Sequence, residues 1–257
     1  MTQHLTSSRV VRSYLSITTN IDPVINPLIE RASDYIQRYT ARTFPKKVTV
    51  NRRLHGTGST RLHVPDNPIL SIEALQVDQL AVTASDGVTD GYLFDDHMIY
   101  LANGQKFTAG FNNVLVSWTA GYRAEESAVV PAGNFPTLTP STGGRASEAI
   151  SVTYDANSVV LTKVDSGPTA GQYALSEDGE YSFNTADGNK SVTMAYYYVP
   201  PTIVQACIEL VGLRLTQRDK IGLKTKSLAT ESITYEDAEV TPSIKALLAQ
   251  FAKRVPN

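Results

Sequence analysis

Apolar positions near both ends of the chain recur with the period of an α-helix. Apolar and aromatic side chains return every three or four residues at 10–15, 28–39, 203–215 and 244–255. This spacing places them on one face of a helix. The pattern predicts two short N-terminal helices, one long helix after residue 200 and a C-terminal helix, with Leu210 buried against the helix over 28–39.

The starts of these helices carry capping residues. Ser7 or Ser8 can cap the first helix, because a serine hydroxyl accepts from the free backbone N–H groups of a first turn. Asn26-Pro27 and Thr241-Pro242 each place a capping side chain before a proline. Proline is favoured at the first helical position. We therefore expect the second helix to begin at 26–27 and the last at 241–242.

The segment between the second helix and residue 122 has a strand pattern. Apolar and polar residues alternate there in short runs, which predicts β-strands. Turn sequences rich in Gly, Asp and Asn separate the runs, at 48–54, 61–64, 69–77, 98–101 and 114–118. This succession predicts a small antiparallel β-meander.

Residues 124–199 differ in composition from the rest of the chain. They contain three basic residues and nine acidic ones, a local net charge of −6. Five further alternating runs follow a Pro/Gly/Thr/Ser stretch, at 150–154, 159–164, 172–175, 181–183 and 191–199. We predict an inserted small β-domain over 124–199, carried by a domain formed from 1–123 plus 200–257. The expected fold class is α+β, a small helical bundle with a β-meander and this insertion.

Overall composition excludes several classes of protein. The 257 residues are 42% hydrophobic and carry 23 basic against 25 acidic groups, a net charge of −2. A protein that coats nucleic acid usually has a basic surplus. The single cysteine cannot form an intrachain disulfide. There is no apolar run long enough for a membrane span and no signal-peptide pattern at the start, so we expect a soluble protein of a reducing cytoplasm.

The chain contains no recognisable catalytic pattern. Residues 222–227 have the lysines of a phosphate-binding loop but lack its second glycine. His55 and His63 flank one predicted hairpin, and Asp95 or Asp96 beside His97 is the only further metal-ligand candidate. No ligand spacing matches a known metal motif, so we expect no catalytic, cofactor or metal site. Cys207 lies on an apolar helix face and is expected in the core.

Basic residues cluster at the end of the long helix. They extend from that helix into the segment that follows it, at Arg214, Arg218, Lys220, Lys224 and Lys226. Cations at a helix C-terminus complement its dipole. A role in partner binding is the alternative interpretation, because the set continues into a long loop.

Several short strings resemble the head–tail connector proteins of tailed bacteriophages, also called adaptor or head-completion proteins. Their order and spacing carry the resemblance more than any one of them. The strings are LIERASDYIQRYTARTF at 28–44, GTGSTRL at 56–62, PILSI at 68–72, VSWTAGY at 116–122, VPPTIVQACIELV at 199–211 and RDKIG at 218–222. The segment 124–199 departs from simple members, in which the strand of the Trp-Thr-Ala-Gly-Tyr string leads almost directly to the Val-Pro-Pro helix.

The resemblance implies a structural virion protein and not an enzyme. Such proteins form a ring, expected to be a dodecamer, that docks under the portal protein after DNA packaging and offers a surface to the next neck or tail-completion protein. DNA passes through the channel of the ring without sequence-specific binding, and no membrane or cofactor takes part. The implied location is the virion neck, between capsid and tail, after assembly in the host cytoplasm.

We predict that the loop over 222–240 and the C-terminal helix carry the portal contact. The loop is long for a compact domain, and such loops are usually functional or disordered. The helix combines an aromatic anchor with neighbouring cations, which is common at interfaces. The predicted contact residues are Leu223, Lys224, Lys226, Tyr235, Phe251, Lys253 and Arg254. The alternative is that Phe251 packs on its own domain.

Two other functions compete with this hypothesis. The tyrosines of 124–199 would suit a β-rich cell-surface or carbohydrate-binding module, although such a module usually has a signal peptide and disulfides. A hydrolase that uses Asp95, Asp96 and His97 is the third hypothesis.

Overall fold

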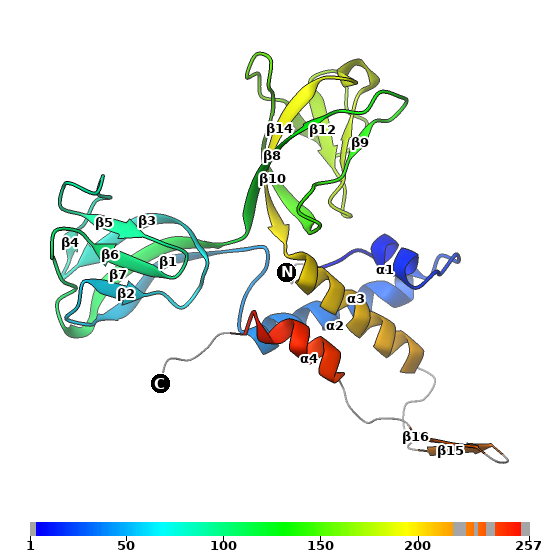
Figure 1. Ribbon diagram of the computed structural model, residues 1–257, viewed down its shortest axis with the longest axis horizontal. Coiled ribbons are helices and arrows are strands. Elements are labelled where there is room, and N and C mark those ends of the chain that lie inside the picture. Colours follow the sequence, from blue (N-terminus) through cyan, green and yellow to red (C-terminus); the bar gives the residue numbers. More distant parts are fainter. Residues whose placement is uncertain (1–3, 218–224, 229–230, 235–239, 253–257) are drawn as a thin grey trace. The chain divides into compact units, whose positions relative to one another are not determined.

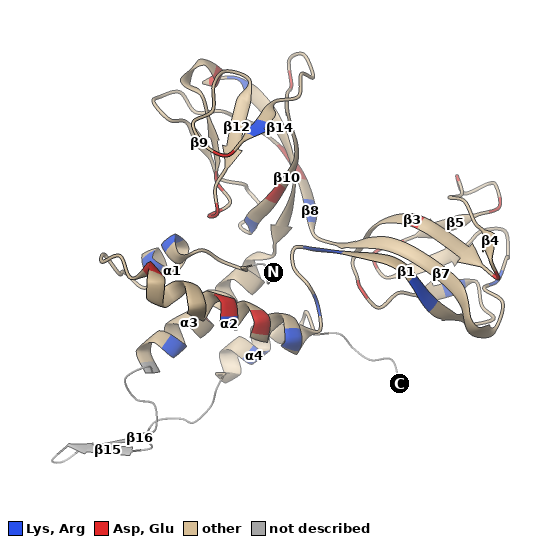
Figure 2. Ribbon diagram, turned by 180° about the vertical axis from the view of Figure 1, so that it is seen from behind, with Lys and Arg blue, Asp and Glu red and all other residues tan. Residues whose placement is uncertain are grey.

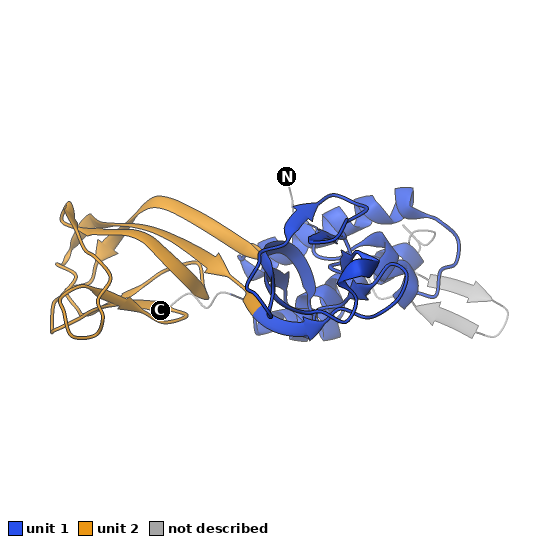
Figure 3. Ribbon diagram, turned by 90° about the horizontal axis from the view of Figure 1, so that it is seen from above, with its two compact units in different colours: residues 1–42, 125–257 blue, residues 43–124 orange. Residues whose placement is uncertain are grey.

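The computed structural model describes residues 4–217, 225–228, 231–234 and 240–252. The chain divides into two compact units (Figures 1 and 3). Unit 1 comprises Met1–Arg42 and Glu125–Asn257, and unit 2 comprises Thr43–Ala124. Unit 1 therefore contains the helices together with the second β-rich segment.

Unit 2 is built from two antiparallel sheets. One sheet has the order β1-β7-β3-β4 and the other the order β2-β6-β5. The strands are β1 (Lys46–Gly56), β2 (Arg61–His63), β3 (Ile69–Val77), β4 (Leu80–Ala81), β5 (Tyr92–Phe94), β6 (Met98–Leu101) and β7 (Gly110–Gly121). The long strand β7 pairs with both β1 and β3 and so organises the larger sheet.

The alternation along β7 explains the core of unit 2. Val114, Val116 and Trp118 point to one face of the strand and are fully buried, as expected for a strand whose side chains alternate between faces. The indole Nε1 of Trp118 donates a hydrogen bond to the backbone oxygen of Asp66 at 3.0 Å. A single apolar cluster, which includes Leu62, Ile69, Leu75, Ile99 and Phe107, surrounds these side chains.

The β-rich segment of unit 1 also forms two sheets. The first has the order β10-β14-β8, and the second has the order β11-β12-β13-β9, in which β11 and β12 are parallel. The strands are β8 (Arg123–Val129), β9 (Thr137–Leu138), β10 (Arg145–Tyr154), β11 (Thr162–Val164), β12 (Gln172–Leu175), β13 (Tyr181–Phe183) and β14 (Ser191–Val199). A short 3-10 helix, η1 (Thr185–Asp187), precedes β14.

Aromatic side chains fill the space between these sheets. Tyr173, Tyr181, Phe183 and Tyr196 are all buried. The ring centroid of Tyr181 lies 5.8 Å from that of Tyr173, 6.5 Å from that of Phe183 and 6.2 Å from that of Tyr196. These separations are those of favourable aromatic pairs. Three of the six tyrosines that motivated a carbohydrate-binding module are therefore core residues.

In the part of unit 1 that the structure describes, four α-helices accompany the β-rich segment. They are α1 (Ser8–Tyr14), α2 (Asp22–Thr40), α3 (Pro201–Gln217) and α4 (Pro242–Ala249), and each of the other three contacts α3. Ser7 caps α1 and Thr241 caps α4, as predicted, since each side chain accepts from a backbone N–H in the first turn. Leu210 and Cys207 on α3 are fully buried, which confirms their predicted places in the core.

The predicted start of the second helix is wrong. Helix α2 begins at Asp22, and Pro27 lies inside it. Pro23 occupies the first turn, where its missing N–H costs no hydrogen bond. The apolar face extends back to the buried Ile25, so packing favours a longer helix although Pro27 cannot donate a backbone hydrogen bond.

The predicted fold class is also wrong. Fourteen strands in four sheets lie between Lys46 and Val199, and only 23% of the described residues are helical. The protein is mostly β, not a helical bundle with a small β-insertion. Helical stripes are conspicuous in a sequence because they persist over several turns, and the prediction therefore gave the four helices more weight than the ten strand runs.

The strand positions were predicted better than their arrangement. All ten predicted runs overlap strands of the structure, but β4, β5, β8 and β9 were missed. The first β-rich segment is not a simple meander, because β7 inserts between β1 and β3. A two-stranded ribbon of β15 (Thr225–Leu228) and β16 (Glu231–Thr234) lies within the predicted loop.

The compact units group the chain in a different way from the predicted domains. Residues 125–199 share a unit with the helices, while 43–124 form the other unit. Whether 124–199 folds as an independent insertion stays a prediction. No helix within the described residues is long and apolar enough to cross a membrane.

Candidate partner-binding surface

Most of the predicted portal-contact residues lie outside the described residues. This holds for Leu223, Lys224, Tyr235, Lys253 and Arg254. For Lys226 the structure gives only the backbone, in strand β15. Their role in binding therefore stays a prediction.

Phe251 is the one predicted contact residue whose side chain is described. It follows α4, and its side chain is half-buried. Its backbone N–H donates to the oxygen of Leu248 at 3.0 Å. Ile244 and Leu248 on α4 are buried, and α4 contacts both α3 and α2. The apolar face of α4 therefore serves the core of its own unit.

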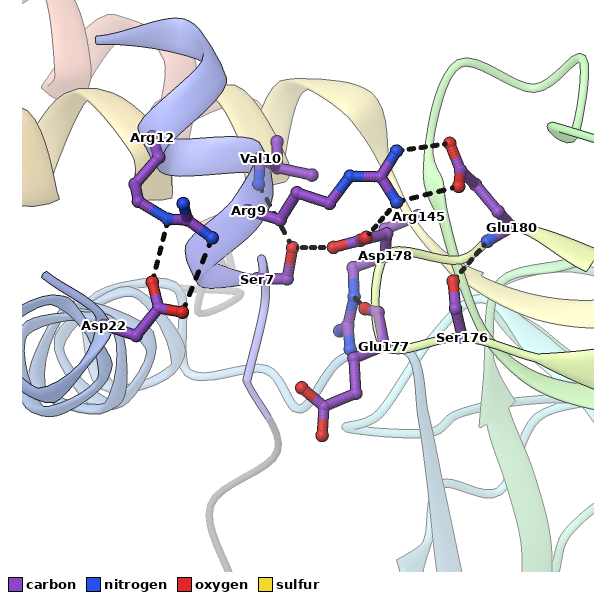
Figure 4. Close-up of polar contacts among 10 residues, drawn as sticks. All are labelled: Ser7, Arg9, Val10, Arg12, Asp22, Arg145, Ser176, Glu177, Asp178 and Glu180. Carbon is purple, nitrogen blue, oxygen red and sulfur yellow. Dashed lines mark hydrogen bonds and ion pairs between the residues drawn. The ribbon is translucent and has the colours of Figure 1, made fainter. Parts of the chain in front are cut away.

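The clearest polar cluster of unit 1 lies where α1 meets the turn between β12 and β13 (Figure 4). Arg9 Nη1 is 2.9 Å from Asp178 Oδ2 and 3.1 Å from Glu180 Oε2. The hydroxyl of Ser7 also donates to the Asp178 carboxylate. One helix N-terminus is thereby tied to a turn about 170 residues further along the chain.

The contact between the start of α1 and the β12–β13 turn is called the joint below. The local sequence explains the backbone conformation on each side of it. Ser7 accepts from the backbone N–H of Val10 while it donates to Asp178. On the other side, the N–H of Gly179 donates to the oxygen of Ser176 and closes the turn. Gly179 has φ +87°, and a Cβ there would lie 2.7 Å from the backbone nitrogen of Ala146. Only glycine combines that backbone conformation with so close an approach.

Arg145 connects the same region through two hydrogen bonds to backbone oxygens. Its Nε donates to the backbone oxygen of Glu177 at 2.6 Å, and its Nη1 donates to the backbone oxygen of His4 at 2.5 Å. Burial lowers the pKa of this guanidinium, although the nearby carboxylates of Glu177 and Asp178 counteract the effect. One side chain of β10 thus connects the N-terminal segment to the turn.

The joint borders a hollow of about 440 Å³ whose charges balance. Its lining includes Arg9 and Arg145 together with Asp178 and Glu180, and apolar side chains such as Val10, Val204 and Ile208 form much of the rest. The two cations are matched by two anions already within reach, so the hollow has no surplus charge for a charged ligand. The arrangement holds the helices and the β-segment together and offers no reactive group.

Two of the side chains considered for catalysis or metal binding, Asp95 and His55, accept hydrogen bonds from backbone groups of unit 2. Asp95 Oδ1 accepts from the backbone N–H groups of His97 and Met98, both at 2.8 Å, and Oδ2 accepts from the Tyr100 hydroxyl at 2.6 Å. The Tyr100 hydrogen bond is the largest cause of the lowered pKa of Asp95. His55 Nδ1 accepts from the N–H of Asn112, and its ring stacks on Phe111.

Two further observations concern reactive groups. Among the described residues, no three His, Cys, Asp or Glu side chains come together in a way that could hold a metal ion. The thiol of Cys207 is fully buried, which raises its pKa to about 12. A thiol that stays protonated is a poor nucleophile.

Sequence reasoning missed the contact between α1 and the turn at 177–180. The acidic residues of this contact lie between β12 and β13. The signal that could have indicated the joint is the isolated cation Arg9 in the first turn of a helix, where the dipole disfavours positive charge. A carboxylate from elsewhere in the chain offsets that penalty.

Comparison of the chain with protein-family models and with curated proteins finds no match in either.

Proposed function

We propose that this protein is a structural component of a tailed-bacteriophage neck. In this proposal it forms an oligomeric ring that connects the portal to the tail and extends the DNA channel after packaging. The proposal rests on the strings that resemble head–tail connector proteins. One structural observation supports it: strings that lie far apart in the sequence pack on one another in the folded chain.

In unit 1 the strings at 28–44 and 199–211 form the contact between α2 and α3. Ile29 and Ile36 on α2 are fully buried, as is Leu210 on α3. The Ser33 hydroxyl lies 3.8 Å from the Cys207 thiol across the same contact. These two strings therefore specify one packed helix pair.

In unit 2 the strings at 68–72 and 116–122 form neighbouring strands. Ile69 pairs with Ala120 and Ile72 pairs with Trp118 in the register of β3 and β7. The resemblance thus falls on core contacts in both units. Core contacts determine a fold, so agreement at these positions supports relatedness better than agreement at surface loops does.

A closed ring of identical subunits needs two different complementary surfaces on each subunit. The proposed portal-facing surface is the segment 222–240 with the end of the chain after α4. In this proposal the exposed side of the acidic segment 124–199 is a second surface for contacts, and its aromatic core holds that surface in shape.

The decisive experiment mixes the purified chain with assembled rings of the portal protein encoded in the same genome. We expect the chain to co-sediment with the portal and to appear as an added ring layer in electron cryomicroscopy, with twelvefold symmetry. A chain that stays monomeric and never co-sediments with portal rings, across a range of salt concentrations, would overturn the proposal.

A deletion variant tests the proposed contact surface. Removal of residues 223–239 should abolish co-sedimentation while the helical circular dichroism of the chain is retained. The matched control is Lys163→Glu, compared with Lys226→Glu, because both substitutions reverse one lysine charge. Only Lys226→Glu should weaken portal binding, and equal binding by both variants would count against this surface.

A further inference from the structure

Helices α2 and α3 share a depression that is lined mainly by arginines. Its volume is about 410 Å³, and its lining residues are Leu28, Arg31, Asp34, Tyr35, Arg38 and Arg214. Three guanidinium groups and one carboxylate give this arginine depression a local charge of +2. Basic positions on these helices are coloured in Figure 2. In contrast to the charge-balanced hollow beside Arg9, it has cations that nothing in its lining neutralises.

Two of the three guanidinium groups are held in place by neighbours. Arg38 Nε is 3.0 Å from Asp34 Oδ1, one helical turn away. The guanidinium carbon of Arg214 lies 5.9 Å from the centre of the Tyr35 ring, within the range of a cation–π contact. Side chains that are already oriented lose less conformational entropy when a ligand binds.

The third cation is available to a ligand. Arg31 is exposed and makes no hydrogen bond or ion pair with any residue that the structure describes. It lies seven positions before Arg38 on α2, which corresponds to about 10 Å along a helix axis. A single small ion cannot contact both Arg31 and Arg38 over this distance. A ligand that binds both arginines must therefore be extended and carry more than one anionic group.

An aromatic pair lies beside the cations. Tyr35 and Tyr39 stack with their ring centroids 6.0 Å apart, and 41% of the surface of Tyr39 is exposed. Guanidinium groups bind phosphate in a bidentate manner, and exposed aromatic rings beside them are typical of surfaces that contact nucleic acid. An acidic protein segment would use the arginines but has less use for the tyrosines.

We propose that the arginine depression binds the sugar–phosphate backbone of a nucleic acid through Arg31, Arg38 and Arg214. Contacts to phosphates carry no sequence information, so the binding is independent of sequence. The chain as a whole has a net charge of −2, so attraction to nucleic acid depends on local basic patches such as this one. Binding is therefore weak and strongly dependent on salt. This inference goes beyond the connector proposal, since a ring can let DNA pass without any phosphate site.

The test is fluorescence anisotropy of the full chain with a short labelled DNA duplex, and with a single strand of the same length, over a series of salt concentrations. The variant Arg31→Ala/Arg214→Ala removes two of the three cations. We expect its affinity to fall about tenfold at low salt. The slope of log K against log[salt] should become shallower by about 1.8, at ~0.9 for each phosphate that an arginine no longer neutralises.

Two controls separate a local site from net charge and from folding. Lys106→Ala/Lys163→Ala removes two exposed lysines from other parts of the chain and should leave affinity and slope unchanged. Arg31→Lys/Arg214→Lys keeps the charges and should retain most of the binding. The single variant Arg31→Ala, at an exposed position, gives a result even if the double variant does not fold.

The outcomes distinguish the proposal from its alternatives. An unchanged slope in the alanine variants, or no binding of either DNA by the parent chain at low salt, overturns the proposal. Tighter binding of a poly-glutamate peptide than of DNA, abolished in the same variants, would assign the depression to an acidic protein partner and overturn it as well. None of these results bears on portal binding, so the connector proposal is tested separately.

Discussion

The two units of this protein differ in the contacts that stabilise each of them internally. Unit 2 has one continuous apolar cluster between two sheets, with Trp118 and Val116 at its centre. Unit 1 joins helices to a β-segment through polar links such as Arg145 to the backbone oxygens of His4 and Glu177. Apolar burial is non-directional, whereas a hydrogen bond needs one donor and one acceptor in a specific geometry. Unit 1 therefore combines an apolar core, which includes Ile29, Ile36 and Leu210, with individual polar pairs between its helices and its β-segment.

Each unit also holds a buried carboxylate among polar partners. In unit 2 the buried Asp66 has its carboxylate 2.9 Å from Lys47 and 3.9 Å from Arg52. In unit 1 the fully buried Asp187 accepts hydrogen bonds from the Tyr154 hydroxyl at 2.6 Å, from Lys190 Nζ at 2.8 Å and from the N–H of Gly171 at 3.1 Å. A network of this kind can determine one precise arrangement, and it loses much of its stabilisation when one member is removed.

The largest expected effect is in the apolar core of unit 2. Leu75→Ala should lower the free energy of unfolding by about 2–5 kcal/mol, because the truncation leaves a cavity. The chain has one tryptophan, Trp118, which belongs to the same cluster. Its fluorescence therefore follows unfolding of unit 2 in urea. A loss below about 0.5 kcal/mol, the size expected at a surface position, would contradict this description of the core.

The matching change in unit 1 is Leu210→Ala. Leu210 is fully buried on α3, so the expected loss is again about 2–5 kcal/mol. Here the measurement is the helical circular dichroism signal, since the four helices α1–α4 belong to unit 1. An unfolding midpoint equal to that of the parent chain would show that the α2–α3 contact tolerates the cavity.

A smaller loss is expected when the polar network of unit 1 is broken. Asp187→Ala should cost about 1.5–3 kcal/mol at neutral pH, the range for hydrogen bonds to a charged group. Burial raises the pKa of this carboxyl, but the hydrogen bonds from Lys190, Tyr154 and Gly171 outweigh it, and the net pKa is lowered. The measurement is urea unfolding of both proteins at several pH values.

The lowered pKa of Asp187 fixes the sign of the pH dependence. The carboxylate stabilises the folded state at neutral pH, and this contribution is lost as the pH falls from the ordinary carboxyl value of about 3.9 through the lower value in the folded state. The parent chain should therefore lose its advantage over Asp187→Ala as the solution is acidified. A difference between the two that stays constant down to pH ~2 would contradict the assignment.

Two tyrosines of one aromatic core provide a finer test. The Tyr196 hydroxyl donates to Glu126 Oε1 at 2.9 Å, so Tyr196→Phe should cost about 1.5 kcal/mol. The buried Tyr181 hydroxyl has no hydrogen-bond partner among the described residues. Tyr181→Phe should be neutral or should stabilise the chain by about 1 kcal/mol, since it removes an unsatisfied polar group. Equal losses from both variants in thermal unfolding would show that Tyr181 has a partner.

The smallest loss of unfolding free energy is expected at Arg9, the exposed residue of the joint between α1 and the β12–β13 turn. Arg9→Ala breaks the pairs with Asp178 and Glu180, but the Arg9 side chain is 64% exposed. Exposed ion pairs contribute at most about 1 kcal/mol. The difference between variant and parent should also shrink at high salt, because ions screen the pairs. A larger loss that salt does not reduce would indicate that the Arg9 stem contributes packing.

The sequence predicted individual helices and strands better than the relative amounts of helix and strand in the fold. The caps Ser7 and Thr241 and the burial of Leu210 and Cys207 follow from local pattern, and the structure confirms them. Strand β8 was missed, because none of its positions is fully buried and its alternation leaves no apolar run. The prediction gave the helical patterns more weight than the strand runs, and it therefore missed that the protein is mostly β.

The sequence by itself determined the features that depend on neighbours in the chain. These features are the helix caps, the strand runs, the turn glycines and the single buried cysteine. Only the tertiary structure decided which strands pair, that β7 lies between β1 and β3, and that Arg9 meets Asp178 and Arg145 meets His4. The reason is physical. A local pattern specifies which face of an element is apolar, but many partners could cover that face. Contacts between groups more than a hundred residues apart form only when the whole chain has folded.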